Sequence, residues 1–223
     1  MKKILLLMLF PTLAFAHGGG IDSSGGHNDR KNGGYHCHKQ PCFGNQTSSD
    51  KALKEAIKEK RPFSYTYNRK DWKHWSDVDG DCMNTRHEIL AAQADGAIKL
   101  SPDGCYVSTG LWDDPFSGEQ LTRASDLDVD HVIPLKWAND HGGNGWSKDK
   151  KERFANDPIN LLAVDDALNQ SKGAKGTDEW MPPNHAFRCE YISIWNQVLQ
   201  SYPELTMSTK QKRVFNRQMD ACE

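Results

Sequence analysis

The sequence lacks an apolar run long enough to cross a membrane, which takes about 20 residues. The nearest candidate lies in residues 1–16, where two lysines precede a short apolar stretch that ends in the small-residue pattern Ala-Phe-Ala. This order of basic, apolar and small residues is typical of a secretory signal peptide that is cleaved before His17. We therefore expect an exported protein, secreted or periplasmic, with no contact to the membrane after cleavage.

The chain also lacks a large excess of charge of either sign. Its 223 residues include 28 Lys and Arg against 30 Asp and Glu, which gives a formal net charge of -2. Cleavage after residue 16 removes two lysines and leaves 26 basic against 30 acidic residues, a net charge of -4. A protein coated all over in positive charge for nucleic acid is excluded, whereas a local basic groove is not.

Aliphatic side chains are almost absent from residues 17–49, which are rich in glycine, asparagine, serine and histidine. Such a segment cannot bury a core of its own, but a structural metal can replace a core, and Zn²⁺ or Cu²⁺ would suit its donors. The candidate ligands are the imidazoles of His17, His27, His36 and His38. The alternative is a linker that a disulfide between Cys37 and Cys42 closes.

The six cysteines form an even set in a chain that we expect to be exported, so disulfides are the default. Sequence alone does not fix which cysteines pair. The order of the cysteines and of the expected elements favours two bridges, Cys82–Cys105 and Cys189–Cys222.

Residues 50–223 have the apolar patterns of one α+β domain, without an internal repeat. Two kinds of segment occur along this part of the chain. Helical patterns cover 50–61, 84–100, 186–202 and 208–222. Strand patterns cover 104–112 and 127–135, and the pattern of 158–173 indicates a strand that runs directly into a helix.

The stretch "DVDHVIP", Asp128–Pro134, places Asp130 beside His131 in the second of these strands. Neighbouring residues in a strand point to opposite faces, so both side chains reach one site only if the strand is twisted, bulged or ends there. Pro134 favours an end. The following strand and helix carry Asn169 back towards this strand, which predicts a strand, loop, strand, helix unit.

These residue types suit the hydrolysis of a phosphodiester. Mg²⁺ prefers oxygen ligands and keeps several waters, so one carboxylate and one amide oxygen suffice when a substrate phosphate supplies the rest. A neutral imidazole beside such an ion can take a proton from water because its ordinary pKa lies near neutrality. The alternative is an Asp-His pair with a structural role at a strand end, with the asparagines as turn and cap residues.

Longer stretches resemble a known family. "DVDHVIP" and "NLLAVDDALNQSKGAK" resemble the HNH nucleases, also called ββα-metal or His-Me finger enzymes, with asparagine in place of the final histidine. "DVDHVIPLKWA", "RFANDPINLLAVDDALNQSKG" and "EWMPP" are similar to secreted HNH proteins related to the C-terminal nuclease domain of GmrSD-type restriction enzymes, over residues 65–223. The histidine-rich segment is similar to a short YHYH-type motif that follows signal peptides.

The resemblance implies a ββα-metal core at about residues 126–176 with additional helices, and a metal-dependent endonuclease that cleaves DNA with little sequence preference, RNA being an open alternative. It implies His131 as the general base. It implies Asn160 as the residue that holds the site loop and orients His131. Asp130 and Asn169 are the implied metal ligands. An oxygen ligand at Asn169 favours Mg²⁺ or Mn²⁺ over zinc or nickel.

Two basic residues are implied contacts to the substrate phosphates. Lys172 stands where these proteins often carry a phosphate-facing lysine, and Arg153 lies beside the expected site. Contacts of this kind would make binding salt-dependent without reading sequence. We expect a monomer, and we expect Asp128, on the same strand face as Asp130, to support the site.

Two other interpretations remain open from the sequence. The histidine-rich segment could be the working part of an exported metal-binding protein, with the HNH-like unit as scaffold. The acids at Asp77, Asp79 and Asp81 with Glu88 are similar to a calcium loop, although Cys82 occupies the position where an EF-hand needs glycine. A turn that caps the next helix is the favoured interpretation of this stretch.

Overall fold

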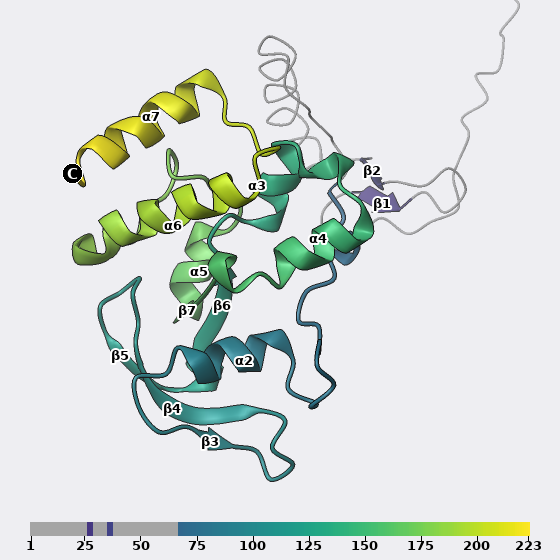
Figure 1. The fold of residues 1–223 in the computed structure, drawn as a ribbon, viewed down its shortest axis with the longest axis vertical. Coiled ribbons are helices and arrows are strands. Elements are labelled where there is room, and N and C mark those ends of the chain that lie inside the picture. The colour runs from purple at the N-terminus through teal and green to yellow at the C-terminus, as the bar shows by residue number, and fades with distance from the viewer. Residues whose placement is uncertain (1–25, 29–34, 38–66) are drawn as a thin grey trace, which may run out of the picture. The chain divides into compact units, whose positions relative to one another are not determined.

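The computed structural model describes residues 26–28, 35–37 and 67–223, and Figure 1 shows the elements they form. The chain divides into two compact units, residues 1–48 and 49–223. The expected signal peptide, and the helix expected over 50–61, lie outside the described residues.

The first unit contains one pair of described strands. β1 (Gly26–Asn28) runs antiparallel to β2 (Tyr35–Cys37), and in their register His27 lies opposite His36. The other two histidines of the expected metal site, His17 and His38, lie outside the described residues, so that site stays a prediction.

The second unit mixes helices with small antiparallel sheets, which confirms the α+β class. Its helices are α2 (Thr85–Ala92), α3 (Leu135–Asp140), α4 (Lys148–Ala155), α5 (Asp166–Lys172), α6 (Arg188–Ser201) and α7 (Thr209–Asp220). Its strands are β3 (Lys99–Leu100), β4 (Val107–Asp113), β5 (Gln120–Arg123), β6 (Leu127–His131) and β7 (Leu161–Asp165). The strand orders are β3-β4-β5 in one sheet and β6-β7 in the other.

The strand, loop, strand, helix unit expected from the sequence is present as β6, β7 and α5 (Figure 1). The two strands pair antiparallel, from Leu127 opposite Asp165 to His131 opposite Leu161. The Asp165 carboxylate accepts a hydrogen bond from the backbone N–H of Leu168 and so caps α5 directly at the end of β7. The connection between the strands is longer than a bare loop because it contains α3 and α4.

Apolar residues on the two faces of the β6-β7 pair belong to two separate cores. Leu127 and Val129 pack in a smaller core with Leu90 of α2. Val164 belongs to a larger aromatic core, to which α6 contributes Tyr191 and other residues. Side chains alternate along a strand, so Asp128 and Asp130, which follow Leu127 and Val129, point to the face of the larger aromatic core.

Two expected elements end earlier than the sequence pattern indicates. The helix expected over 84–100 ends at Ala92, because Asp95 donates its backbone N–H to Leu111 and the chain turns there to form β3. The strand expected over 127–135 ends at His131: the backbone N–H of Val132 still donates to the opposite carbonyl of Asn160, but Pro134 has no N–H to continue the pairing and α3 begins directly after it.

Both favoured disulfides are present. Cys82–Cys105 joins the loop before α2 to the turn before β4, and Cys189–Cys222 joins the start of α6 to the chain just after α7. Within the described residues, no helix has the length and apolarity needed to span a bilayer.

We expect loss of either disulfide to lower the free energy of unfolding by about 3–4 kcal/mol, because each restricts the unfolded chain across a sequence separation of 23 or 33 residues. The double variants Cys82→Ser/Cys105→Ser and Cys189→Ser/Cys222→Ser test this by guanidinium unfolding without reductant. Unfolding free energies equal to that of the wild type would show that the bridges do not stabilise the fold.

Candidate active site

Two polar side chains leave the end of β6 in different directions. The pairing of β6 with β7 proceeds residue by residue, so normal strand alternation holds up to its last residue. Asp130 contacts Lys172 of α5, whereas the imidazole of His131 contacts Ala155 at the end of α4. A reactant that uses both groups therefore has to lie at the end of the strand, where both faces can be reached.

The His131 imidazole is held in one tautomer. Its Nε2 lies 2.8 Å from the carbonyl oxygen of Ala155. A carbonyl can only accept a hydrogen bond, so the proton belongs on Nε2, and Nδ1 carries the lone pair. The ring of Trp75 stacks on the imidazole, with centroids 5.3 Å apart and planes 24° apart, and the ring of His74 approaches at 6.4 Å.

Burial keeps this imidazole neutral. His131 is only 6 % exposed, and desolvation lowers its pKa to about 3. The hydrogen bond to Ala155 acts in the opposite direction, while the nearby charges of Arg69, His74 and Lys172 lower the pKa further. At neutral pH the ring is therefore in the form that can accept a proton.

Asn160 clamps the backbone that follows His131. Its fully buried side chain accepts a hydrogen bond from the N–H of Ile133 at 2.7 Å and donates one to the Ile133 carbonyl at 3.2 Å. Its own carbonyl accepts the N–H of Val132. These three bonds fix the chain as it leaves the strand, through contacts of the kind that the resemblance implies for this asparagine.

Asp130 and Lys172 form a buried ion pair. The Lys172 ammonium donates to Asp130 Oδ1 and to the His131 carbonyl oxygen, both at 2.9 Å, and the lysine is fully buried. Desolvation raises the pKa of Asp130 to about 6 although the ammonium acts against it, and desolvation lowers the pKa of Lys172. Lys172 thus faces a carboxylate in the interior, in contrast to the phosphate-facing position that the resemblance implies.

Asn169 faces Asp128, which lies nearer the surface. The Asn169 amide donates to Asp128 Oδ2 at 3.1 Å, and Arg86 approaches the other carboxylate oxygen at 3.7 Å. The Asp128 side chain remains 41 % exposed. Asp128 therefore orients Asn169, and its role in supporting a metal site stays a prediction.

Oxygen atoms of the kind that Mg²⁺ or Mn²⁺ prefers are available on this side of β6. Asp130 Oδ2 is buried and has no hydrogen-bond partner among the described residues. The amide oxygen of Asn169 and the carboxylate of Asp128 lie on neighbouring positions of α5 and β6. The donor set fits a hard divalent cation, with the Lys172 ammonium as a competing positive charge.

The acidic loop before α2 is organised as a turn, and the helix itself is capped by Asn84, whose side chain accepts the backbone N–H of His87. Within the described residues, the ligand atoms of Asp77, Asp79 and Asp81 lie within 4.8 Å of one another. The Asp77 carboxylate accepts the backbone N–H groups of Gly80 and Cys82. This arrangement matches the turn favoured from the sequence over a calcium loop.

Arg153 is exposed on α4. Its charge acts on the hydroxyl of Tyr202. Burial and a hydrogen bond to Asp157 raise the pKa of Tyr202, while Arg153 lowers it. This places the guanidinium near the Tyr202 hydroxyl, so a phosphate contact by Arg153 stays a prediction.

Sequence reasoning missed the segment that covers the imidazole. Trp75, His74 and Arg69 are separated from His131 by more than one element of the chain. Trp75 begins the stretch "WSDVDGDCMNTRHEIL", which resembles the same secreted HNH proteins, but the resemblance gave it no role, and "NRKDWKHWS" is otherwise marked only by its basic and aromatic residues.

Comparisons with known proteins identify the family of the chain. Residues 86–216 match the family model described as GmrSD restriction endonucleases, C-terminal domain. The chain is 35% identical over 158 residues to a protein of Arthroderma benhamiae named "Uncharacterized secreted protein", and the match covers 70% of this chain and 76% of the relative. No solved structure matches. The family match spans the ββα unit and more than half of the sequence, and the chain therefore belongs to the family of the GmrSD restriction endonuclease C-terminal domain.

Proposed function

We propose that the protein is an exported, metal-dependent HNH endonuclease that hydrolyses phosphodiester bonds in DNA with little sequence specificity. The observation that carries the proposal is the neutral imidazole of His131, which is fixed at the end of β6 by the Ala155 carbonyl inside a ββα unit. The family match supports a nuclease, and the secreted relative supports export. RNA is the second substrate to test.

In the proposed reaction, His131 acts as the general base. Its Nδ1 accepts a proton from a water molecule, and the resulting hydroxide attacks the phosphorus while the bond to the leaving oxygen breaks. The Ala155 carbonyl stabilises the protonated ring because it keeps its hydrogen bond from Nε2 throughout. Asn160 keeps the ring in place through its clamp on Ile133.

Asp130 and Asn169 would hold the divalent ion, with Asp128 orienting the amide. When bound, Mg²⁺ or Mn²⁺ would supply Lewis-acid stabilisation of the charge that develops on the phosphate and on the leaving oxygen. Lys172 supplies the positive charge that neutralises Asp130 in the interior. We assign it this role in place of direct phosphate binding.

Because the protein has no net positive charge, local groups of basic side chains have to hold the substrate. Exposed basic side chains lie on several elements, and they include Arg69, Lys73, Arg153, Lys210, Lys212, Arg213 and Arg217. Binding through such groups contacts phosphates and not base edges, so it would be salt-dependent and largely independent of sequence. This is the basis for proposing low specificity.

We expect His131→Ala to lower the rate of plasmid cleavage in Mg²⁺ by about 10²–10⁴-fold, because it removes the proton acceptor. The measurement is the nicking of supercoiled plasmid over time, repeated with linear DNA and RNA and with Mg²⁺, Mn²⁺, Zn²⁺ or chelator. His185→Ala, which removes an exposed histidine of another element, is the matched control. A folded His131→Ala protein that cleaves at the wild-type rate would refute the assigned mechanism.

Acid should destabilise the wild type more than a His131→Gln variant. The native imidazole stays neutral down to about pH 3, whereas the unfolded chain binds a proton below about pH 6.5. Stability is therefore lost as the pH falls between these values, and no loss from this group occurs above them. At pH 5 we expect the wild type to lose about 2 kcal/mol more than the variant, relative to pH 7.

Urea unfolding of both proteins at pH 7 and pH 5 measures this difference. The raised pKa of Asp130 has the opposite dependence on pH, but it is present in both proteins and cancels in the comparison. Parallel losses of stability in the two proteins would show that the native imidazole does not resist protonation.

Lys172→Met should cost about 3–5 kcal/mol of stability, because it leaves the Asp130 carboxylate buried without a counter-charge. The double variant Asp130→Leu/Lys172→Met should recover most of this loss, since it buries no charge, but it should not cleave DNA. Chemical unfolding and plasmid nicking measured on the same samples separate the two effects. A Lys172→Met protein as stable as the wild type would contradict the buried ion pair.

A further inference from the structure

The last turn of α4 holds the catalytic imidazole in two ways. The carbonyl of Ala155 accepts the hydrogen bond from His131 Nε2 at 2.8 Å. The next residue, Asn156, acts indirectly, because its side chain binds the chain on either side of His74 and Trp75. Its Nδ2 donates to the Lys73 carbonyl at 2.8 Å, and its Oδ1 accepts the Ser76 N–H at 2.9 Å.

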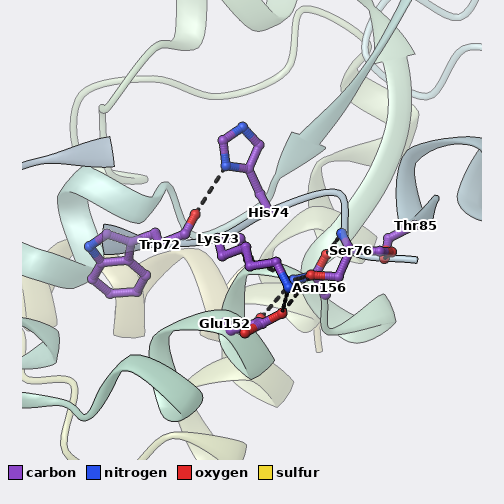
Figure 2. A network of polar contacts seen from close by, with 7 residues as sticks. All are labelled: Trp72, Lys73, His74, Ser76, Thr85, Glu152 and Asn156. Atoms are coloured by element: carbon purple, nitrogen blue, oxygen red, sulfur yellow. Dashed lines mark hydrogen bonds and ion pairs between the residues drawn. The ribbon is translucent and has the colours of Figure 1, made fainter. Parts of the chain in front are cut away.

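We call the two contacts of Asn156, to the Lys73 carbonyl and to the Ser76 N–H, the bracket. Figure 2 shows how neighbouring side chains complete it. Glu152, one turn earlier on α4, accepts hydrogen bonds from the Ser76 hydroxyl and from the Lys73 ammonium, both at 2.7 Å. The Ser76 carbonyl accepts the backbone N–H and the hydroxyl of Thr85, at the start of α2. Ser76 is buried, so its own bonds to Glu152 and Thr85 are largely shielded from water, whereas the ion pair of Lys73 with Glu152 is exposed.

The residue inside the bracket has a conformation that tryptophan rarely adopts. Trp75 has a φ of 60°, in the left-handed region that favours glycine. Residues held in such a conformation persist where the surrounding structure determines them, and they cluster at functional sites. Here the bracket supplies that constraint, and the side chain it directs lies stacked on the His131 ring.

We propose that Trp75 is a positioning residue for the reaction. Its ring covers one face of the His131 imidazole and, together with the Ala155 hydrogen bond, fixes both the plane and the rotation of the base. Asn156 and Glu152 act one step further away, since they hold the backbone that directs Trp75. The inference rests on the proposed function, because it assigns the imidazole a reaction in which its orientation matters.

A merely structural tryptophan would have different consequences. Loss of packing alone lowers stability and leaves the folded enzyme with its normal turnover. Loss of positioning lowers kcat, because displacement of a reacting group by about 1 Å can cost about 10²-fold. It leaves KM nearly unchanged, since Trp75 acts on the base and not on the substrate.

The test compares Trp75→Leu and Trp75→Phe with the wild type in steady-state cleavage of a short DNA duplex in Mg²⁺. Trp75→Leu should lower kcat by about 10–100-fold with little change in KM, and Trp75→Phe should restore most of it because an aromatic face remains. The matched control is Trp180→Leu, which removes a half-buried tryptophan that packs against Phe116 and Tyr191. Equal kcat values for Trp75→Leu and Trp180→Leu, or failure of phenylalanine to restore kcat, would overturn the proposal.

A second variant and a second measurement keep the test independent of folding and of activity. Asn156→Asp preserves the side-chain size but removes the donor to Lys73, and it should lower kcat in the same direction. NMR relaxation of the His131 ring signals reports how rigidly the imidazole is held. The wild type should show a rigid ring, and Trp75→Leu should show a more mobile one, although the Ala155 carbonyl still selects the Nε2–H tautomer.

The two proposals fail in distinguishable ways. A wild type that cleaves neither DNA nor RNA with any of the metals would refute the proposed function, while the NMR comparison would still decide whether Trp75 fixes the ring. A His131 ring that is equally rigid in Trp75→Leu and in the wild type, when the wild type cleaves DNA, would refute the positioning role alone.

Discussion

The hydrogen bond from His131 to the Ala155 carbonyl is the contact on which the arrangement of the site depends. β6 ends at His131, and the chain then forms α3 and α4 before it returns as β7. The bond joins His131, where this connection begins, to the last turn of α4. Phe154 and Ala155 of that turn are buried in the larger core. Close packing of that core therefore determines where the imidazole points, and the carbonyl determines which nitrogen is free to accept a proton.

The ion pair of Asp130 and Lys172 sets the electrostatic character of the other face of β6. Buried ion pairs contribute little net stability, because the cost of desolvating two charges offsets their attraction. The raised pKa of Asp130 shows that Lys172 does not fully compensate for its burial. A carboxylate with poor solvation interacts more strongly with an additional cation than a hydrated one does, since the effective dielectric constant is lower. The same burial that weakens the pair as a source of stability makes Asp130 a suitable partner for a divalent ion.

The ββα unit could be predicted from the sequence because its signals are local. The strand residues, the Asp165 cap and the helix that follows it are contiguous, and their polar residues have recognisable spacing. The surroundings of His131 could not be predicted in this way. Trp75 reaches the ring through a bracket formed by a distant helix, and Lys172, which the resemblance led us to expect facing a substrate phosphate, is buried against Asp130. Both depend on tertiary contacts that leave no periodic pattern in the chain.

The position of the Cys82–Cys105 disulfide connects export with the geometry of the site. Cys82 lies just before α2, and Thr85 at the start of that helix donates two hydrogen bonds to the Ser76 carbonyl. Ser76 is the residue that follows Trp75, so the bridge, the helix start and the ring that covers His131 form one continuous series of contacts. In an oxidising compartment the bridge restricts this series, and in a reducing one its first link is absent. The covalent bond that only the oxidised protein possesses thus lies next to the contacts that support the segment over the proposed catalytic base.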